Sequence, residues 1–145
     1  MDRVKLKLIE QFSFSTIISI RITDINYGGH VGNDSFLSLI HEARQQFLHH
    51  FNYSELAFEG TSLIMCDVSI EFKKELHYGD QVKVSVGATA FDKIGFDLHY
   101  LLEVHKKGEV FLAAKAKTGM MCYDYSAKKK VPVPIEASGK LSPNP

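Results

Sequence analysis

The chain has 145 residues, a length that predicts a single domain, and its 45% hydrophobic and 23% charged residues are typical of a globular protein. Lys and Arg together number 17, as do Asp and Glu, so the formal net charge is zero. This balance argues against a protein that binds nucleic acid or a membrane surface through bulk positive charge, and we expect neither partner.

Cysteine content and hydropathy indicate the compartment. Cys66 and Cys122 are too few and too far apart for a disulfide framework or a paired-cysteine metal site. The longest apolar runs are far shorter than a membrane span, and the charged N-terminal segment lacks the apolar stretch of a signal peptide. We therefore expect a cytoplasmic protein.

The first strong pattern is an alternation around residues 18–23, where isoleucines at 18, 20 and 22 interleave with polar residues and predict a strand with one buried face. Residues 4–8 alternate more weakly and fit either an edge strand or a loose arm. Residues 24–33 contain three glycines and two asparagines, which predicts a loop with unusual backbone angles.

A long helix is predicted next, because apolar residues recur every three or four positions from Phe36 to Phe51. Asn33 is suited to cap its N-terminus, and Asp34 in the first turn complements the helix dipole. Four segments rich in β-branched and aromatic residues follow, separated by turn signals, at residues 62–74, 81–91, 96–106 and 110–123.

This order predicts an α+β fold in which a long central helix packs against a curled antiparallel sheet of about five strands. Residues 1–135 form the single predicted domain, and residues 136–145, with Ser, Gly and Pro, are expected to be a flexible tail. One helix cannot cover a wide sheet completely, which favours a homo-oligomer.

The segment from Arg21 to Phe36 resembles the loop-and-helix motif of hotdog-fold acyl-CoA thioesterases of the 4-hydroxybenzoyl-CoA thioesterase type, notably in Gly29-His30-Val31-Gly32-Asn33. Three further stretches are similar to that family: Ala43-Arg44, Tyr78-Gly79-Asp80-Gln81-Val82, and the last strand with Lys130-Val131-Pro132-Val133-Pro134. The resemblance spans roughly residues 12 to 135. It implies a hotdog fold, a homodimer or homotetramer, and hydrolysis of an acyl-CoA or acyl-carrier-protein thioester.

The sequence departs from the family pattern at three positions. The catalytic acid of the family falls on Asn26, its usual first motif Asn on Gly32, and its helix Glu on His41, with Glu42 one residue later. An Asn side chain is neither a nucleophile nor a general base. Some acyl-carrier-protein thioesterases of this fold also have Asn in the loop, so the resemblance still implies hydrolysis.

Thioester hydrolysis requires donors for the developing oxyanion and a positioned water or nucleophile. A loop that leads into a helix N-terminus supplies unpaired N–H groups and the positive end of the helix dipole. By resemblance, the amides near Val31, Gly32 and Asn33 fill this role, and Gly29 belongs to the same substrate-binding loop.

The catalytic candidates are Asn26, His30, Asn33 and Asp24, each with a structural alternative. Asn26 can hold the attacking water or orient the thioester, or it can bond its own loop backbone. Asp24 is the nearest carboxylate and is either the base or a loop anchor. His30 can pass a proton to the leaving thiolate or fix the loop.

Three helix residues complete the candidates. Asp34 and Glu42 are expected to face solvent, although either can replace the missing carboxylate, and His41 is expected on the helix surface or at an interface.

We expect no metal and no separate cofactor. The seven histidines are scattered without the spacing of a helical ligand pair, and no phosphate-binding glycine motif is present. Coenzyme A would enter as part of the substrate. Residues 1–72 carry 5 basic and 9 acidic side chains, a net of −4, and residues 73–145 carry 12 and 8, a net of +4. The candidate partners of its phosphates are therefore Lys73, Lys74, Lys106, Lys107 and Lys128 to Lys130.

Two alternatives to a thioesterase remain at this point. The first is a hotdog protein that binds an acyl-CoA or acyl-carrier thioester without hydrolysing it, which Asn26 favours. The second is a hydratase or dehydratase, which requires a His and Asp pair in a different motif.

Overall fold

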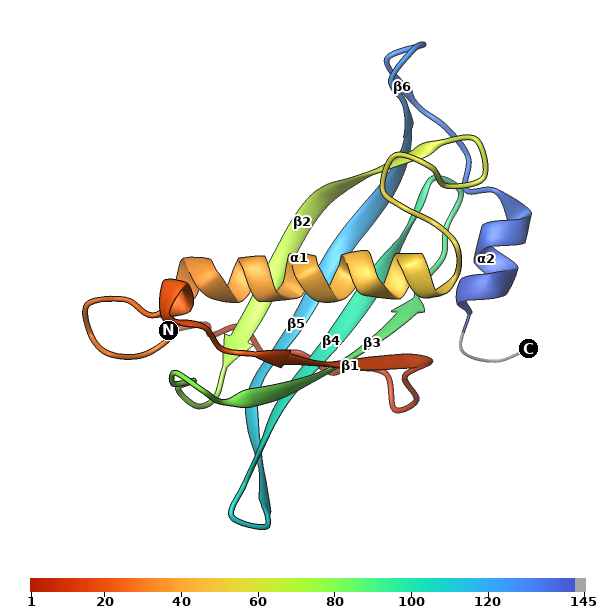
Figure 1. Cartoon of the computed structure of the whole chain (residues 1–145). Coiled ribbons are helices and arrows are strands. Elements are labelled where there is room, and N and C mark those ends of the chain that lie inside the picture. Colours follow the sequence, from red (N-terminus) through yellow and green to blue (C-terminus); the bar gives the residue numbers. More distant parts are fainter. Residues whose placement is uncertain (143–145) are drawn as a thin grey trace.

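The computed structural model describes residues 1–142 and contains one curled antiparallel sheet with a long helix across one face (Figure 1). The sheet has six strands in the order β1-β3-β4-β5-β2, with β6 paired to β5. In chain order the elements are β1 (Phe14–Ser19), a 3₁₀ turn (Ile22–Asp24), α1 (Asn33–His50), β2 (Ser62–Phe72), β3 (Gln81–Thr89), β4 (Gly95–Lys106), β5 (Glu109–Asp124), β6 (Lys129–Lys130) and α2 (Ile135–Leu141). This architecture confirms the predicted α+β hotdog arrangement.

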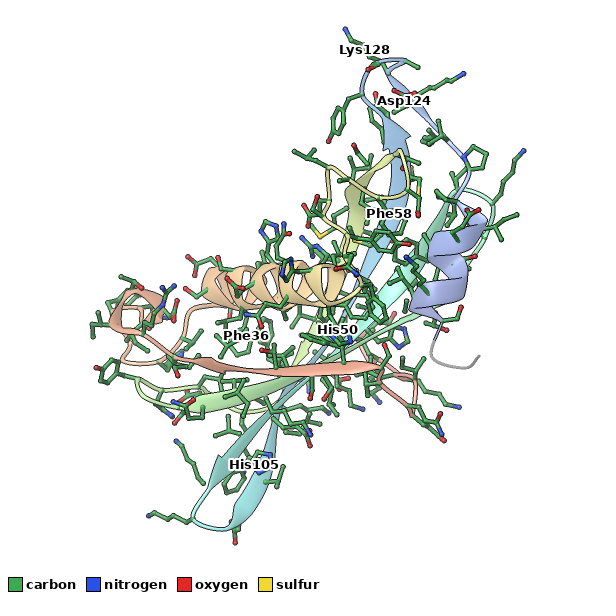
Figure 2. The ribbon with its side chains drawn as sticks, turned by 45° about the vertical axis from the view of Figure 1, so that its right-hand side comes forward. Phe36, His50, Phe58, His105, Asp124 and Lys128 are labelled. Carbon is green, nitrogen blue, oxygen red and sulfur yellow. The ribbon has the colours of Figure 1, made fainter. Side chains whose placement is uncertain are left out.

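The core lies between α1 and the concave face of the sheet. The apolar stripe of α1 is buried there, including Phe36, Ile40 and Phe47. The strands supply the opposite wall with alternating buried residues, most regularly along β4. Figure 2 shows His105 near the tip of the β4–β5 hairpin and Lys128 at the turn after β5, at opposite ends of the long strands.

The first strand lies earlier in the chain than the isoleucine alternation predicts. β1 ends at Ser19, and the backbone turns into the 3₁₀ segment because the Asp24 carboxylate accepts the Arg21 N–H at 2.8 Å. Ile22 is consequently 70% exposed rather than buried in the sheet. Gly32, not Asn33, is the N-cap of α1, and Asn33 is the first helical residue.

Residues 136–142 also differ from the flexible tail that the composition predicts. They belong to helix α2 and its end, in which Ala137 and Leu141, one helical turn apart, are buried in the same core as α1. Residues 143–145 lie outside the described residues.

The weakly alternating N-terminal segment is an arm and not a strand. Its backbone lies against the sheet, with Leu6 N–H donating to Glu71 at 3.0 Å and Ile9 N–H donating to His99 Nδ1 at 2.9 Å. Within residues 1–142, no helix is long and apolar enough to cross a membrane.

Candidate active site

The loop before α1 is closed by its own backbone. Asn26 N–H donates to the His30 carbonyl at 2.9 Å, and Gly29 N–H donates to the Asn26 carbonyl at 3.1 Å. Gly29 has φ +84°, a conformation that favours glycine, and Tyr27 at the tip is fully exposed. The loop therefore holds a fixed shape at the N-terminus of α1.

Unpaired amides are present where the loop joins the helix. The first helical bond runs from Phe36 N–H to the Gly32 carbonyl. The N–H groups of Asn33 and Asp34 have no hydrogen-bond acceptor among the described residues, whereas the antiparallel bridge between Ile25 and Val31 directs the Gly32 N–H toward the Asp24 carbonyl. Val31 differs from its predicted role, because its N–H donates to the Leu76 carbonyl at 2.8 Å and its side chain is buried. The available donors are thus the amides of Asn33 and Asp34.

The side chains of Asp34 and Asn26 both lie close to the position that a Cβ of residue 32 would occupy. A Cβ at position 32 would lie 2.6 Å from Asp34 Oδ1 and 3.6 Å from Asn26 Nδ2. The Asp34 side chain therefore folds back over the helix N-terminus, where only a glycine leaves it room. Asn26 uses its side-chain oxygen to accept Gly28 N–H at 2.8 Å, which leaves the amide nitrogen as the free end of that side chain.

This arrangement brings together a carboxylate, a carboxamide and two backbone donors within a few residues of each other. In the sequence, Asp34 is only one of two candidates, with Glu42, to replace the catalytic carboxylate of the family. Its proximity to Asn26 depends on the glycine between them, so the signal in the sequence is the absence of a side chain at position 32. Glu42, the other replacement, accepts a hydrogen bond from Gln46 at 2.8 Å farther along α1.

Asp24 is placed apart from this group. Asp24 is only 8% exposed. Its carboxylate accepts a hydrogen bond from the Arg21 N–H and lies 3.9 Å from Arg21 Nε. These contacts match the loop-anchor alternative rather than the position of a catalytic base.

His30 connects the loop to the segment between β2 and β3. Its Nδ1 lies 3.2 Å from the Val31 carbonyl and its Nε2 lies 3.8 Å from Glu75 Oε1. Glu75 in turn lies 3.5 Å from His77 Nε2. The sequence carries no signal for this contact, because it joins residues that are 45 positions apart.

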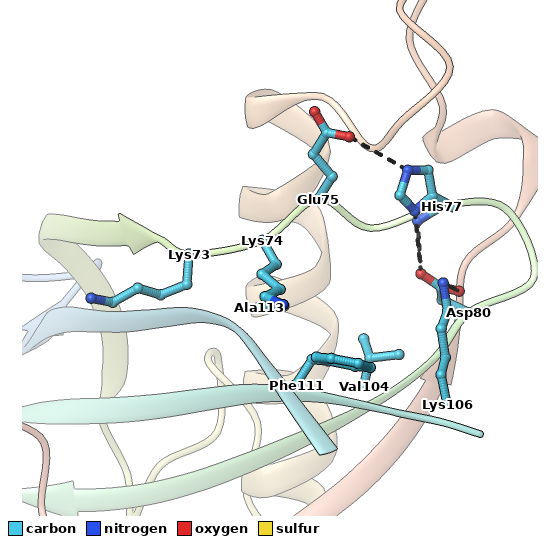
Figure 3. Close-up of a pocket in the computed structure, with 9 residues that line it drawn as sticks. All are labelled: Lys73, Lys74, Glu75, His77, Asp80, Val104, Lys106, Phe111 and Ala113. Atoms are coloured by element: carbon cyan, nitrogen blue, oxygen red, sulfur yellow. Dashed lines mark hydrogen bonds and ion pairs between the residues drawn. The ribbon is translucent and has the colours of Figure 1, made fainter. Parts of the chain in front are cut away.

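A basic cavity of about 430 Å³ begins at that segment (Figure 3). Its apolar floor is formed by Val104, Phe111 and Ala113, and its rim carries Lys73, Lys74 and Lys106 together with Glu75, His77 and Asp80. Two of the lysines are ion-paired, Lys73 with Glu71 and Lys106 with Asp80, both at 2.7 Å. Lys74 has its ammonium 4.4 Å from the centre of the Phe111 ring instead.

The described part of the chain has no group of three or more His, Cys, Asp or Glu side chains arranged to hold a metal ion. The groups that the site offers are therefore backbone amides, one carboxylate, one carboxamide and one imidazole.

Comparisons with known proteins identify relatives of this architecture. Residues 20–141 match the family model of the thioesterase-like superfamily. A 1,4-dihydroxy-2-naphthoyl-CoA hydrolase of Microcystis aeruginosa is 26% identical over 118 residues, which cover 79% of this chain and 83% of the relative.

Two solved structures share the fold. A 1,4-dihydroxy-2-naphthoyl-CoA thioesterase from Synechocystis superposes with a TM-score of 0.78 at 24% identity, covering 88% of this chain and 94% of that one. A 4-hydroxybenzoyl-CoA thioesterase variant in complex with 4-hydroxybenzoyl-CoA superposes with a TM-score of 0.81 at 13% identity, covering 89% and 98%.

Proposed function

The chain belongs to the thioesterase-like superfamily, and from that premise we propose that it hydrolyses an acyl-CoA thioester to a free acid and coenzyme A. The observation that carries the proposal is the group around Gly32, where unpaired amides at the N-terminus of α1 face the Asp34 carboxylate and the Asn26 carboxamide. The 26%-identical naphthoyl-CoA hydrolase supports the same reaction class.

The N–H groups of Asn33 and Asp34 hydrogen-bond the thioester carbonyl oxygen in this mechanism. As water attacks the carbonyl carbon, negative charge develops on that oxygen, and the donors and the helix dipole stabilise it. Loss of one such donor typically costs on the order of a hundredfold in rate.

Asp34 is the base in the proposed mechanism. Its carboxylate takes a proton from the attacking water, and the free amide nitrogen of Asn26 hydrogen-bonds the substrate or the water beside it. The tetrahedral intermediate then collapses, the carbon–sulfur bond breaks, and the electron pair leaves on sulfur. In this proposal His30 donates a proton from Nε2 to the leaving thiolate, and the proton taken up by Asp34 is released to solvent.

We place the coenzyme A phosphates at the basic cavity. Lys74 is the favoured contact because Lys73 and Lys106 are already paired with carboxylates. The cavity shares Glu75 and His77 with the segment that contacts His30, so one substrate can contact both places.

We also propose that the protein is a cytoplasmic homodimer. β2 is the last strand of the sheet path and leaves its outer edge unpaired over most of its length. Met65, Val68 and Phe72 on this strand are 45%, 37% and 47% exposed and form an apolar surface next to that edge, on the side of α1, which a second copy paired to the edge would cover.

The first experiment measures free-thiol release from a panel of aromatic, short-chain and long-chain acyl-CoAs. We expect turnover of at least one of them, and Asp34→Asn should lower kcat about a hundredfold while the matched control Glu42→Gln keeps wild-type activity. If no acyl-CoA is hydrolysed above the buffer rate while calorimetry still detects binding, the non-hydrolytic alternative is correct.

The second experiment separates recognition of coenzyme A from the chemistry. Lys74→Glu should raise KM for an acyl-CoA about tenfold or more and leave kinetics on the matching acyl-N-acetylcysteamine thioester unchanged, because that substrate lacks the phosphates. Lys128→Glu, at the opposite end of the sheet, is the control. Equal KM values for Lys74→Glu and wild type on acyl-CoA would place the phosphates elsewhere.

A further inference from the structure

The segment between β2 and β3 holds the loop before α1 at both of its ends. Before the loop, Ile20 N–H donates to the Asp80 carbonyl at 2.9 Å. After the loop, Val31 N–H donates to the Leu76 carbonyl at 2.8 Å. Residues 76–80, which we call the clamp, therefore fix where the backbone enters the loop and where it leaves toward α1.

The clamp is closed by the side chain of Asp80. Its Oδ2 accepts the His77 N–H at 2.8 Å, and the Asp80 N–H donates to the His77 carbonyl at 3.1 Å. Asp80 is only 6% exposed, so water has little access to replace these bonds. The adjacent Leu76, whose carbonyl holds Val31, is fully buried and closely packed. The Asp80 carboxylate therefore determines the shape of the clamp.

Lys106 supplies the cation that the buried Asp80 carboxylate requires. It is the last residue of β4, and its Nζ lies 2.7 Å from Asp80 Oδ1 (Figure 3). His77 Nδ1 lies farther away, at 4.0 Å, and carries a charge only when the imidazole is protonated. Removal of one partner of a buried ion pair leaves an uncompensated charge, which is strongly unfavourable. Without Lys106, we expect the Asp80 carboxylate to turn toward solvent and to release the His77 N–H.

Lys106 also lines the basic cavity, where the proposed function places the phosphates of coenzyme A. Its two possible roles have different kinetic consequences. A lysine that binds a phosphate contributes to KM for an acyl-CoA, whereas a lysine that shapes the clamp contributes to kcat for any thioester. The second role is favoured because the Lys106 ammonium is already paired with Asp80.

We infer that Asp80 and Lys106 are positioning residues of the thioesterase site. Their ion pair keeps the clamp closed and thereby holds the amides of Asn33 and Asp34 in place. These amides follow Val31 by two and three positions along the backbone, so a shift of the clamp at Val31 displaces them directly. A displacement of about 1 Å at a reacting centre costs up to about a hundredfold in rate. The inference rests on the proposed thioester hydrolysis.

The test compares Lys106→Met with wild type on an acyl-CoA and on the matching acyl-N-acetylcysteamine thioester, which lacks the phosphates. The variant should lower kcat about tenfold or more on both substrates and leave KM for the acyl-CoA within about threefold of wild type. Lys106→Arg retains the cation beside Asp80 and should keep kcat within about threefold. Lys117→Met is the matched control and should keep wild-type kinetics, because this lysine is ion-paired with Asp67 at 2.9 Å in the middle of β5.

A loss confined to KM for the acyl-CoA would assign Lys106 to the phosphates and overturn the inference, as would unchanged kinetics in the folded variant. Lys106→Gln retains a hydrogen-bond donor without the charge and covers the case in which Lys106→Met does not fold, with kcat about threefold or more lower on both thioesters. If wild type hydrolyses neither thioester, the proposed function fails separately. Hydrogen exchange then decides the role of the clamp: the Ile20 and Val31 amides should lose protection at least about tenfold more than those of β4 in the Lys106 variants, and an equal change would overturn it.

Discussion

Gly32 is the position at which the proposed chemistry can be tested without removing any catalytic group. Its backbone has φ −71° and ψ 158°, which alanine adopts without strain, so Gly32→Ala changes only the space above the backbone. The added Cβ would lie 2.6 Å from Asp34 Oδ1. An ordinary carbon–oxygen contact is longer by roughly 1 Å, and the carboxylate must move by about that distance.

A displacement of this size at a catalytic base costs up to about a hundredfold in rate. We therefore expect Gly32→Ala to lower kcat between about tenfold and a hundredfold, equivalent to about 1.4 to 2.8 kcal/mol of transition-state stabilisation. The stability of the fold should be unchanged or slightly higher, because alanine restricts the unfolded chain. Steady-state kinetics and chemical denaturation measure the two quantities.

The expected loss of kcat in Gly32→Ala is caused by the displaced Asp34 carboxylate. In an Asp34→Asn background, Gly32→Ala should therefore add less than about twofold to the loss already present. Gly139→Ala in α2 is the matched control, because a Cβ there meets nothing within 4 Å. Full activity in Gly32→Ala, or an equal additional loss in the Asp34→Asn background, would refute the role assigned to Asp34.

Three further predictions test the loop, the sheet and the N-terminal arm. Asn26→Ala should lower kcat about tenfold or more in steady-state assays, and unchanged kinetics would restrict Asn26 to its bond with the loop backbone. Gly95→Ala should lower the free energy of unfolding in urea by about 2 kcal/mol or more, since its Cβ would overlap the Met120 carbonyl, and wild-type stability would contradict this packing. Burial lowers the pKa of His99, beside Asp97 and Lys117, so its acceptor bond from Ile9 N–H should persist above about pH 6.5 and be lost as pH falls through the lowered pKa. The protection factor of the Ile9 amide, which corrects for the slower intrinsic hydrogen exchange in acid, should then fall below that pKa. Equal protection factors above and below it would exclude His99 as the acceptor that holds the arm.

Much of the fold follows from local patterns in the sequence. The spacing of Phe36, Ile40 and Phe47 predicts α1 because a helix of that length buries one stripe, and the structure buries the same residues. The first strand is less well predicted, because the alternation continues to Ile22 while the strand has already ended at Ser19, before the turn that the Asp24 carboxylate closes. A local pattern cannot reveal where a side-chain hydrogen bond ends a strand.

Helix α2 and the candidate site show the limits of such patterns. Ala137 and Leu141 are only one turn apart, too short a repeat to distinguish a docked helix from a tail. The contact between His30 and Glu75 depends on β2 delivering a distant segment beside the loop. The position of the Asp34 carboxylate near Gly32 depends on the direction of the Asp34 side chain, which no local sequence pattern predicts. The sequence supplies these residue types, and only the packed structure supplies their distances.

The two oppositely charged halves of the sequence carry different parts of the candidate site. The N-terminal half has a net charge of −4 and carries the loop with Asp34, whereas the half with a net charge of +4 carries the lysines of the basic cavity. The two halves meet inside one chain at His30 and Glu75, 3.8 Å apart. A coenzyme A thioester entering this region has its phosphates attracted to the lysines and repelled from Asp34. Its uncharged thioester then lies toward the amides of α1, so electrostatics alone favours the reactive orientation over the reverse one.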